Sequence, residues 1–320
     1  MRLGGYGSTL SRTKQQARNL IRLAVTRRRL FHPVRLSYAV MFYQDSELQY
    51  PVEVEDPNPL FAKMLQQAIG GLEGEMRVAM QYFFQAAAVP DEYAQYREAL
   101  RDTAAEELGH IEMLATAVRK NLLGAPKSFA DVEDSQDFAA LAGLQPRQFL
   151  SSGLNAMPMD SSGVPFNGSY IVATGNLASD MYANITAESG GRLLATRLYE
   201  MTDDPGMKDM LAYLIARDTM HQNQWVAILK DLGDPEEPFD VHPIPDSFPN
   251  ETENQEFNYD FMSTKTEAEN DPGEAWTTGE SPDDRGEFSF INQIELDGQE
   301  ISIPTPDPAT YNSPEPADNN

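Results

Sequence analysis

The sequence predicts an all-α protein, a four-helix bundle with one long crossover that is followed by an extended C-terminal tail. Three observations lead to this class. Apolar residues recur at three-to-four spacing over four long segments of the chain. The connections between these segments are short, then long, then short. The C-terminal part has a different composition, since residues 231–320 hold 24 acidic residues, two basic residues and 12 of the 22 prolines.

The four predicted helices are about 59–88, 91–123, 169–201 and 205–232. Pro59 and Pro205 suit a first helical turn, where the missing N–H group has no helical partner. Pro90, Gly124 and Gly233 follow the last turns, as residues that stop a helix do. Helices of roughly 27 to 33 residues are too long for an ordinary globular domain and suit a bundle.

The connections predict the topology of the bundle. A few residues join the first helix to the second and the third to the fourth, whereas about 45 residues separate the second from the third. A short helix is expected in this crossover near residues 135–150. Two hairpins joined by one long crossover form the ferritin-like topology.

The composition excludes several classes of protein. The chain has no cysteine, so it has no disulfide, thiolate nucleophile, iron–sulfur cluster or zinc–thiolate site, and a metal must be held by His, Asp and Glu. No apolar run approaches the roughly 20 residues that span a bilayer, which predicts a soluble protein. A net charge of −26 disfavours binding to nucleic acid and to anionic membranes.

The N-terminal 40 residues differ from the rest of the chain. They hold nine of the 24 basic residues and no acidic residue. One interpretation is a targeting or basic arm, because transit peptides are rich in Arg and poor in acids. The other is an overlong reading frame with the natural start at Met41. The segment lacks the features of a signal peptide, which predicts a cytoplasmic protein.

The C-terminal segment cannot build a helical core, because it combines few apolar residues with many prolines. We expect either disorder or an extended tail that packs on the body or on neighbouring subunits, with short strands at 288–291 and 300–303. The predicted domains are therefore an extension at 1–40, a catalytic bundle at 41–232 and a tail at 233–320.

The second predicted helix carries a Glu-x-x-His pair. Glu107 and His110 stand at i and i+3 on one apolar stripe, so both side chains can bind one ion. Glu106 and Glu112 fall off this stripe and are interpreted as surface charges.

The other three helices each place a polar side chain on an inward face. Glu75 has small and apolar neighbours at helical spacing, whereas Glu73 faces elsewhere and is expected to be solvated. Glu188 is flanked by apolar and small residues. Asp218 and His221 share one face of the fourth helix and repeat the i, i+3 spacing.

These residues together predict a metal centre. Each one taken singly is more often a partly exposed charge or a hydrogen-bonded core residue. Three carboxylates from three helices in an apolar interior would repel one another, and each buried charge costs several kcal/mol unless cations compensate it. Di-iron and di-manganese bundles take one Glu from each of two helices and a Glu-x-x-His from each of the others. Here Asp218 replaces the Glu of the fourth helix.

Oxygen ligands with one imidazole per metal suit manganese or iron. Two such ions can cycle together by two electrons, which is the number needed to make or break the O–O bond of peroxide. Helix spacing alone cannot separate manganese from iron, and it leaves three functions open: an enzyme that acts on peroxide, a di-iron oxidase, and a non-enzymatic metal-storage protein.

Four separated motifs resemble those of the non-haem manganese catalases. They are GGLEGEM at 70–76, AEELGHIEM at 105–113, GLNAMPMDSSGVPFNGSYIVATGNLASDM at 153–181 and ARDTMHQNQ at 216–224. They occur in the family's order, with the crossover between the second and the third, and the resemblance covers about residues 41–265.

The resemblance implies a di-manganese centre that converts two molecules of hydrogen peroxide into water and dioxygen, cycling between Mn(II)2 and Mn(III)2. The implied reaction needs no organic cofactor. The resemblance also implies a homo-hexamer in which the tail embraces neighbouring subunits. The implied metal ligands are Glu75, Glu107, His110, Glu188 and His221, with Glu107 bridging the two ions.

Two departures from the family's pattern concern the site. Ala187 stands where the family often has Arg, so a guanidinium that gates or tunes the site would be missing. Asp218 stands where the family often has Glu. We expect Asp218 either to move the peroxide proton as general base or to orient His221, and both roles stay open.

Two further interpretations concern residues near the expected centre. Tyr82 can donate to a ligand carboxylate or be an ordinary core tyrosine. Glu98 and Asp102, at i and i+4, resemble a calcium site reported in the family, although a solvated acidic face explains them equally well.

Overall fold

The computed structural model describes residues 46–125, 151–233, 257–263, 271, 273–282 and 286–292. The chain divides into two compact units, Met1–Pro243 and Ile244–Asn320. The predicted extension at 1–40, the short helix near 135–150 and the strand at 300–303 lie outside the described residues.

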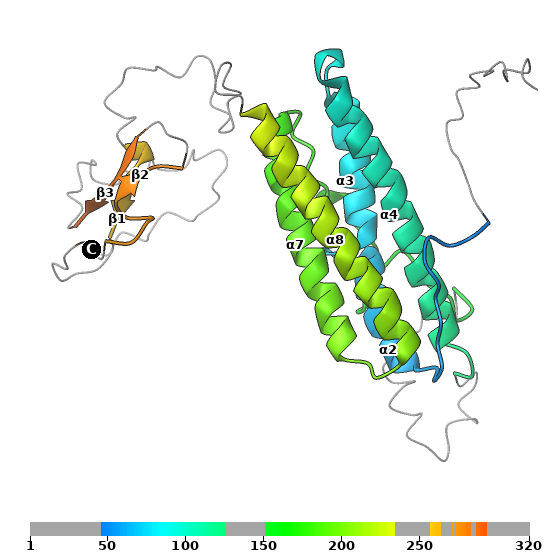
Figure 1. Ribbon diagram of the computed structural model, residues 1–320. Helices are drawn as coiled ribbons and strands as arrows, with labels where there is room; N and C mark the ends of the chain where they lie inside the picture. Colours follow the sequence, from blue (N-terminus) through cyan, green and yellow to red (C-terminus); the bar gives the residue numbers. More distant parts are fainter. Residues whose placement is uncertain are drawn as a thin grey trace, which may run out of the picture. The chain divides into compact units, whose positions relative to one another are not determined.

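The first unit is a bundle of long antiparallel helices (Figure 1). They are α2 (Pro59–Gly70), α3 (Glu75–Ala88), α4 (Ala94–Asn121), α7 (Leu177–Glu200) and α8 (Pro205–Leu232). Helix α3 packs mainly on α4, and α7 packs mainly on α8. Among the described helices, none has the length and apolarity to cross a membrane.

The prediction of one continuous helix over 59–88 is wrong. The chain forms α2 and α3, separated by a turn that contains Gly71 and Gly74. Gly70, the last residue of α2, has no side chain for a separate reason, because a Cβ atom there would lie 2.5 Å from the backbone of Met159. The crossover therefore approaches the end of α2 more closely than a side chain allows. Because of the break, Glu75 becomes the first residue of α3.

The fourth predicted helix has the bounds of α8, and its first turn is capped by Asp204, whose side chain accepts from the N–H of Met207 at 2.9 Å. The second prediction corresponds to a 3-10 turn, η1 (Asp91–Tyr93), followed by α4. The third helix begins later than predicted. A 3-10 turn, η3 (Gly168–Tyr170), and an extended segment precede α7, which is capped by Asn176.

Buried glutamines attach the crossover to the bundle. Gln66 donates to the carbonyl groups of Met157 and Met159 at 2.6 and 2.9 Å. Gln85 donates to the carbonyl of Val172 at 2.8 Å and exchanges hydrogen bonds with the buried Asn184. The crossover is irregular here, so its carbonyl groups have no partner in a helix or sheet. The glutamine side-chain amides supply the hydrogen bonds that buried backbone groups need.

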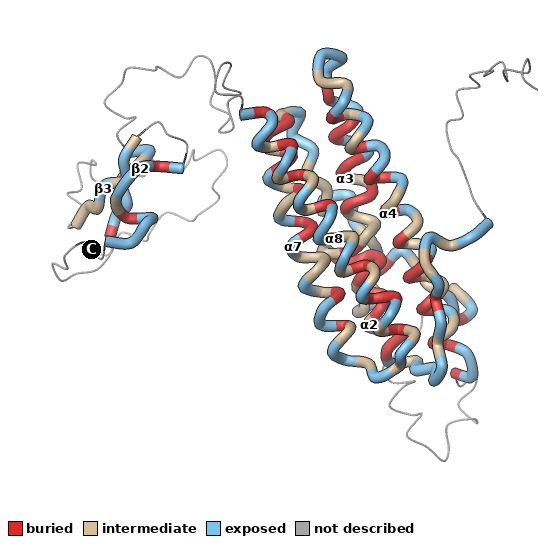
Figure 2. Tube along the Cα trace, viewed as in Figure 1, coloured by how far each residue is buried: buried red, intermediate tan, exposed pale blue. Residues whose placement is uncertain are grey.

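Two apolar clusters fill the bundle, and buried residues face inward along every helix (Figure 2). The α2-side core contains Leu65, Leu114 and Leu211. The α3-side core contains Tyr82 and Trp225. Along α4 and α8 the two cores are separated by a stretch with buried polar residues, which therefore form a layer between them.

The second unit contains a three-stranded sheet of order β1-β3-β2. Strand β1 (Asp260–Met262) pairs in parallel with β3 (Glu287–Ile291), and β2 (Gly279–Glu280) pairs with β3 in antiparallel orientation. Strand β3 confirms the strand predicted at 288–291. The acidic tail thus has local β structure among its described residues and no described helix longer than a 3-10 turn.

Candidate metal centre

The polar layer brings together side chains from four helices. Glu75 comes from the start of α3, where the helix dipole favours a carboxylate. Glu107 and His110 come from α4, Glu188 from α7 and His221 from α8. The side chains of the last four are at most 3% exposed, and that of Glu75 is 14% exposed.

Glu107 lies at the centre of the group. Its Oε2 atom lies 2.7 Å from Nδ1 of His110, and its Oε1 atom lies 2.9 Å from Nδ1 of His221. The two imidazole rings lie 5.9 Å apart at an angle of 28°. Each oxygen of one carboxylate therefore faces a different histidine, which is the arrangement that a bridging ligand needs.

Two three-residue groups share Glu107. In one group, ligand atoms of Glu75, Glu107 and His110 lie within 4.8 Å of one another, and in the other, those of Glu107, Glu188 and His221 do. Among the described residues, Glu107 Oε1, His110 Nε2 and both ring nitrogens of His221 are buried without a hydrogen-bond partner. Such orphaned donors and acceptors are costly. This donor set fits two hard cations that share one carboxylate.

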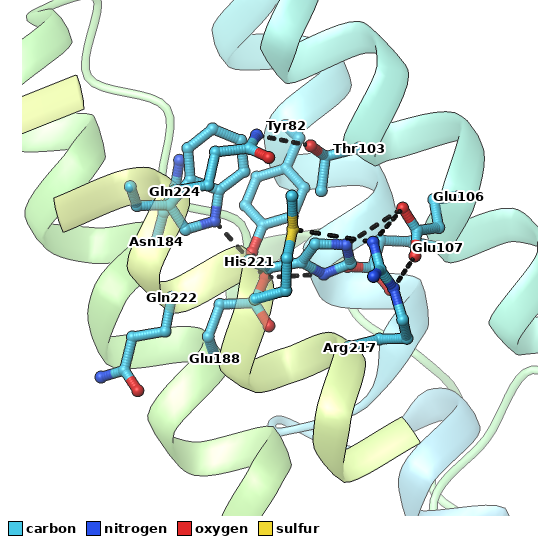
Figure 3. A network of polar contacts seen from close by, with 12 residues as sticks. Tyr82, Thr103, Glu106, Glu107, Asn184, Glu188, Arg217, His221, Gln222 and Gln224 are labelled. Carbon is cyan, nitrogen blue, oxygen red and sulfur yellow. Dashed lines mark hydrogen bonds and ion pairs between the residues drawn. The ribbon is translucent and has the colours of Figure 1, made fainter. Parts of the chain in front are cut away.

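Glu188 is held in place by two aromatic residues of the α3-side core. The hydroxyl of Tyr82 donates to Oε1 of Glu188 (Figure 3). Nε1 of Trp225 donates to the same oxygen at 3.4 Å. The two aromatic rings also pack on each other with centroids 4.9 Å apart. Of the two interpretations of Tyr82, the structure supports a donor to a site carboxylate.

The interpretation of Glu106 as a surface charge is wrong. Its carboxylate turns into the bundle, where Oε2 lies 3.2 Å from Nε2 of His221 and Oε1 lies 3.6 Å from Nε2 of His110. Arg217 donates to both oxygens, at 2.6 and 3.2 Å (Figure 3). Glu106 could not be recognised from the apolar stripe of α4, because it lies off that stripe. It does stand four residues before His110, as Arg217 stands four residues before His221.

Burial and nearby charges shift the pKa values of the site's carboxyl groups in opposite directions. Burial and then the nearby Glu107 raise the pKa of Glu75 and of Glu188 well above the usual value. Burial also acts to raise the pKa of Glu107, but His110 and His221 outweigh it and lower this pKa to about 2. Of the three ligand carboxyl groups, Glu107 is therefore the one that stays ionised in the metal-free protein. Glu75 and Glu188 are protonated there, whereas bound cations would stabilise their ionised forms.

The fourth-helix pair is also strongly shifted. Burial and the charge of Glu107 raise the pKa of Asp218 to about 7, and Asp218 is 4% exposed. Burial lowers the pKa of His221, but Glu106 and Glu107 raise it more, to about 10. The acid and the imidazole thus differ by about three units in pKa although both lie on α8.

Ala187 packs in the α3-side core with 3% exposure and, as predicted from the sequence, brings no guanidinium to the site. A different arginine on α7 acts on the site. The charge of Arg192, one helical turn beyond Glu188, lowers the pKa of Asp218 against the larger effect of burial.

The remaining sequence-predicted residues lie at the surface or at its edge. Glu112 is exposed, as predicted. Glu73 is half-buried and accepts from Nε2 of Gln67 at 3.2 Å rather than being fully solvated. Glu98 and Asp102 are both exposed.

Comparison with known proteins decides the family. The family model described as manganese containing catalase matches residues 41–317. The chain belongs to this family. A manganese catalase of Bacillus subtilis is 42% identical over 275 residues, which cover 85% of this chain and 98% of the relative. A manganese catalase of Lactiplantibacillus plantarum is 33% identical over 273 residues, which cover 85% and 99%.

A solved structure of the family also matches. The crystal structure of KatB, a manganese catalase from Anabaena PCC7120, aligns with a TM-score of 0.61 and 25% identity, covering 79% of this chain and 99% of that chain. Membership in the manganese-containing catalases and the helical content of the structure confirm the predicted ferritin-like four-helix bundle.

Proposed function

We propose that this protein is a manganese-dependent catalase that converts two molecules of hydrogen peroxide into two of water and one of dioxygen. One observation carries the proposal: two groups of ligand atoms share Glu107, whose two oxygens face two different histidines. The proposed ligands of two manganese ions per subunit are Glu75, Glu107, His110, Glu188 and His221.

The manganese pair, when bound, supplies a redox couple that can alternately oxidise and reduce peroxide by two electrons. The protein supplies proton transfer. We assign this role to Asp218, because it is a buried carboxyl group close to Glu107 and is not one of the five proposed ligands. The alternative role, orienting His221, is better suited to Glu106, whose carboxylate lies at Nε2 of that ring.

Access to the site is restricted. The α2-side and α3-side cores close the two ends of the polar layer, and only Glu75 of the five proposed ligands has appreciable exposure. Gly191 leaves room beside Asp218, since a Cβ atom there would lie 3.3 Å from Oδ2. A small molecule such as peroxide can enter where a larger substrate cannot.

The test is metal analysis of the purified full-length protein together with oxygen release from peroxide. Two manganese per chain and rapid oxygen release are expected. Glu107→Ala should abolish both metal retention and oxygen evolution, because it removes a ligand from both groups. Glu112→Ala, an exposed acid on the same helix, is the matched control and should retain both.

Two outcomes would overturn the proposal. Bound iron with slow turnover and a requirement for a reductant would indicate a di-iron oxidase or peroxidase. Metal retention without turnover of peroxide would indicate a storage protein. A Glu107→Ala variant that keeps its activity would refute the ligand assignment.

A homo-hexamer is the assembly we propose. A pocket of about 450 Å³ with an almost entirely apolar lining opens beside α3 and α4, and it includes Met76, Met80 and the exposed Leu108. Exposed apolar surface of this kind suits a subunit interface. Light scattering after gel filtration should give six times the subunit mass, and a monomeric mass would contradict the assembly.

We also propose a calcium site at Glu98 and Asp102. Glu98 and Asp102 are exposed, and Glu98 already pairs with Arg101 at 3.3 Å. Titration of the protein with calcium should show one site per chain that Asp102→Asn removes, and no binding would exclude it. The cytoplasmic location stays a prediction.

A further inference from the structure

We propose that Glu106 and Arg217 form one positioning unit that fixes both histidines of the metal centre at once. The inference rests on the proposed ligand set, because it concerns what holds His110 and His221 in place. It assigns a role outside that set to a carboxylate and to a guanidinium 111 residues away.

The geometry separates the two sides of each imidazole. Nδ1 of both rings faces Glu107, at 2.7 Å for His110 and 2.9 Å for His221. Nε2 of both rings faces Glu106, at 3.6 and 3.2 Å. The Glu107 carboxylate thus lies on the Nδ1 side of both rings, among the proposed ligands, and the Glu106 carboxylate lies on their Nε2 side.

This separation determines the tautomer. A histidine that binds a cation through Nδ1 carries its proton on Nε2, and that proton needs an acceptor. Within the described part of the chain, Nε2 of each ring is buried and forms no hydrogen bond. One oxygen of Glu106 lies near each Nε2, at 3.6 Å for His110 and 3.2 Å for His221, so this single carboxylate is placed to accept from both rings once a bound cation fixes them. Carboxylates in this position orient a ligand histidine and make it more basic.

Arg217 keeps the carboxylate in place. Its Nε and Nη2 atoms donate to different oxygens of Glu106, at 2.6 and 3.2 Å, so the guanidinium fixes the plane of the carboxylate as well as its position. Glu106 and Arg217 come from α4 and α8, the same two helices that carry the histidines. The unit therefore also fixes the relative position of the two rings.

The competing explanation is that Glu106 and Arg217 simply join two helices. An inter-helix ion pair would affect the stability of the metal-free protein and leave its affinity for metal unchanged. A positioning unit must instead affect the affinity of both metal sites, because Glu106 faces both histidines. Metal affinity and metal-free stability therefore distinguish the two explanations.

The experiment measures binding of Mn²⁺ to full-length, metal-free protein by competition with a fluorescent chelator. Glu106→Gln should weaken both binding steps about 10- to 100-fold. Arg217→Lys keeps the charge and loses the two-pronged contact, and should weaken both steps by about threefold or more. Glu112→Gln and Arg101→Lys, which change exposed residues, are the matched controls and should bind like wild type.

A double-mutant cycle tests whether Arg217 acts through Glu106. In the Glu106→Gln background, Arg217→Lys should change the affinity by less than about threefold. Absorption spectra of the Co²⁺-substituted proteins give a second readout, which should change in both single variants because the histidine ligands are reoriented. Thermal unfolding of each metal-free variant, followed by circular dichroism, measures how much the contact between Glu106 and Arg217 contributes to the stability of the metal-free protein.

Three results would overturn the inference: a folded Glu106→Gln protein that binds Mn²⁺ like wild type, a loss confined to one of the two binding steps, or a lower melting temperature with unchanged affinity. If Glu106→Gln does not fold, Arg217→Lys decides by the same criteria. Wild-type protein that binds no Mn²⁺ would refute the proposed function itself, and is distinguishable because it precedes any comparison of variants.

Discussion

The metal-free protein should lose stability as the pH rises from 5 to 8. The folded state raises the pKa of Asp218 from 3.8 to about 7, so the protonated carboxyl stabilises the fold at low pH, and this contribution is lost as the pH rises towards 7. The contribution of His221 to the free energy of unfolding changes with pH in the same direction. Folding raises its pKa from 6.5 to about 10, so this contribution is lost as the pH rises above 6.5. Glu107 has the opposite sign, but its contribution is lost only as the pH falls below 4.5.

The magnitude follows from linkage. Each unit of pH between the unfolded and folded pKa values of one group changes the free energy of unfolding by about 1.4 kcal/mol. Between pH 5 and 7, Asp218 alone therefore accounts for a loss of about 3 kcal/mol. This loss is a substantial part of the roughly 5–15 kcal/mol that stabilises a typical domain.

Urea denaturation of the metal-free protein, followed by circular dichroism at steps from pH 5 to 8, measures this slope. Asp218→Asn should flatten it by about 3 kcal/mol between pH 5 and 7, because an amide cannot ionise. Glu112→Gln, at an exposed acid, should leave it unchanged. A wild-type protein equally stable at pH 5 and 8 would refute the claim that the site buries uncompensated carboxyl groups.

Three further predictions concern single contacts. Tyr82→Phe removes the hydroxyl that donates to Glu188, so unfolding of the metal-free protein in urea should show a loss of about 0.5–1.5 kcal/mol, and an unchanged stability would mean that the contact is not formed. Gln85→Leu removes the acceptor of the buried Nδ2 group of Asn184, whose Oδ1 still accepts from Gln81, and should cost about 1–3 kcal/mol in a thermal melt, whereas a neutral result would show that water replaces the lost amide. Gly70→Ala inserts a methyl group against the crossover backbone at 2.5 Å and should cost about 1–3 kcal/mol, and a wild-type melting temperature would contradict this close approach.

The long helices and the inward residues could be predicted because they depend on local periodicity. Glu107 and His110 share a stripe at i, i+3, and α8 begins and ends at the predicted residues. The break between α2 and α3 was missed because the apolar period continues across it, although Gly70, Gly71 and Gly74 mark a turn in the sequence.

Glu106 was misread for a related reason. A helical wheel of α4 shows only that Glu106 lies beside the stripe, whereas its position is set by Arg217 on α8. The role of Tyr82 was left open because its partner, Glu188, lies 106 residues away on α7. The proposed metal ligands can be predicted from the pattern of a single helix. The residues that position those ligands can be identified only once the packing of two helices is known.

Anomalous diffraction from a crystal of the manganese-loaded protein, recorded above the manganese absorption edge, tests the central claim most directly. We predict two peaks per subunit, one beside Glu75 and His110 and one beside Glu188 and His221, with Glu107 between them. A single peak, two peaks elsewhere, or no peak within reach of Glu107 would contradict it.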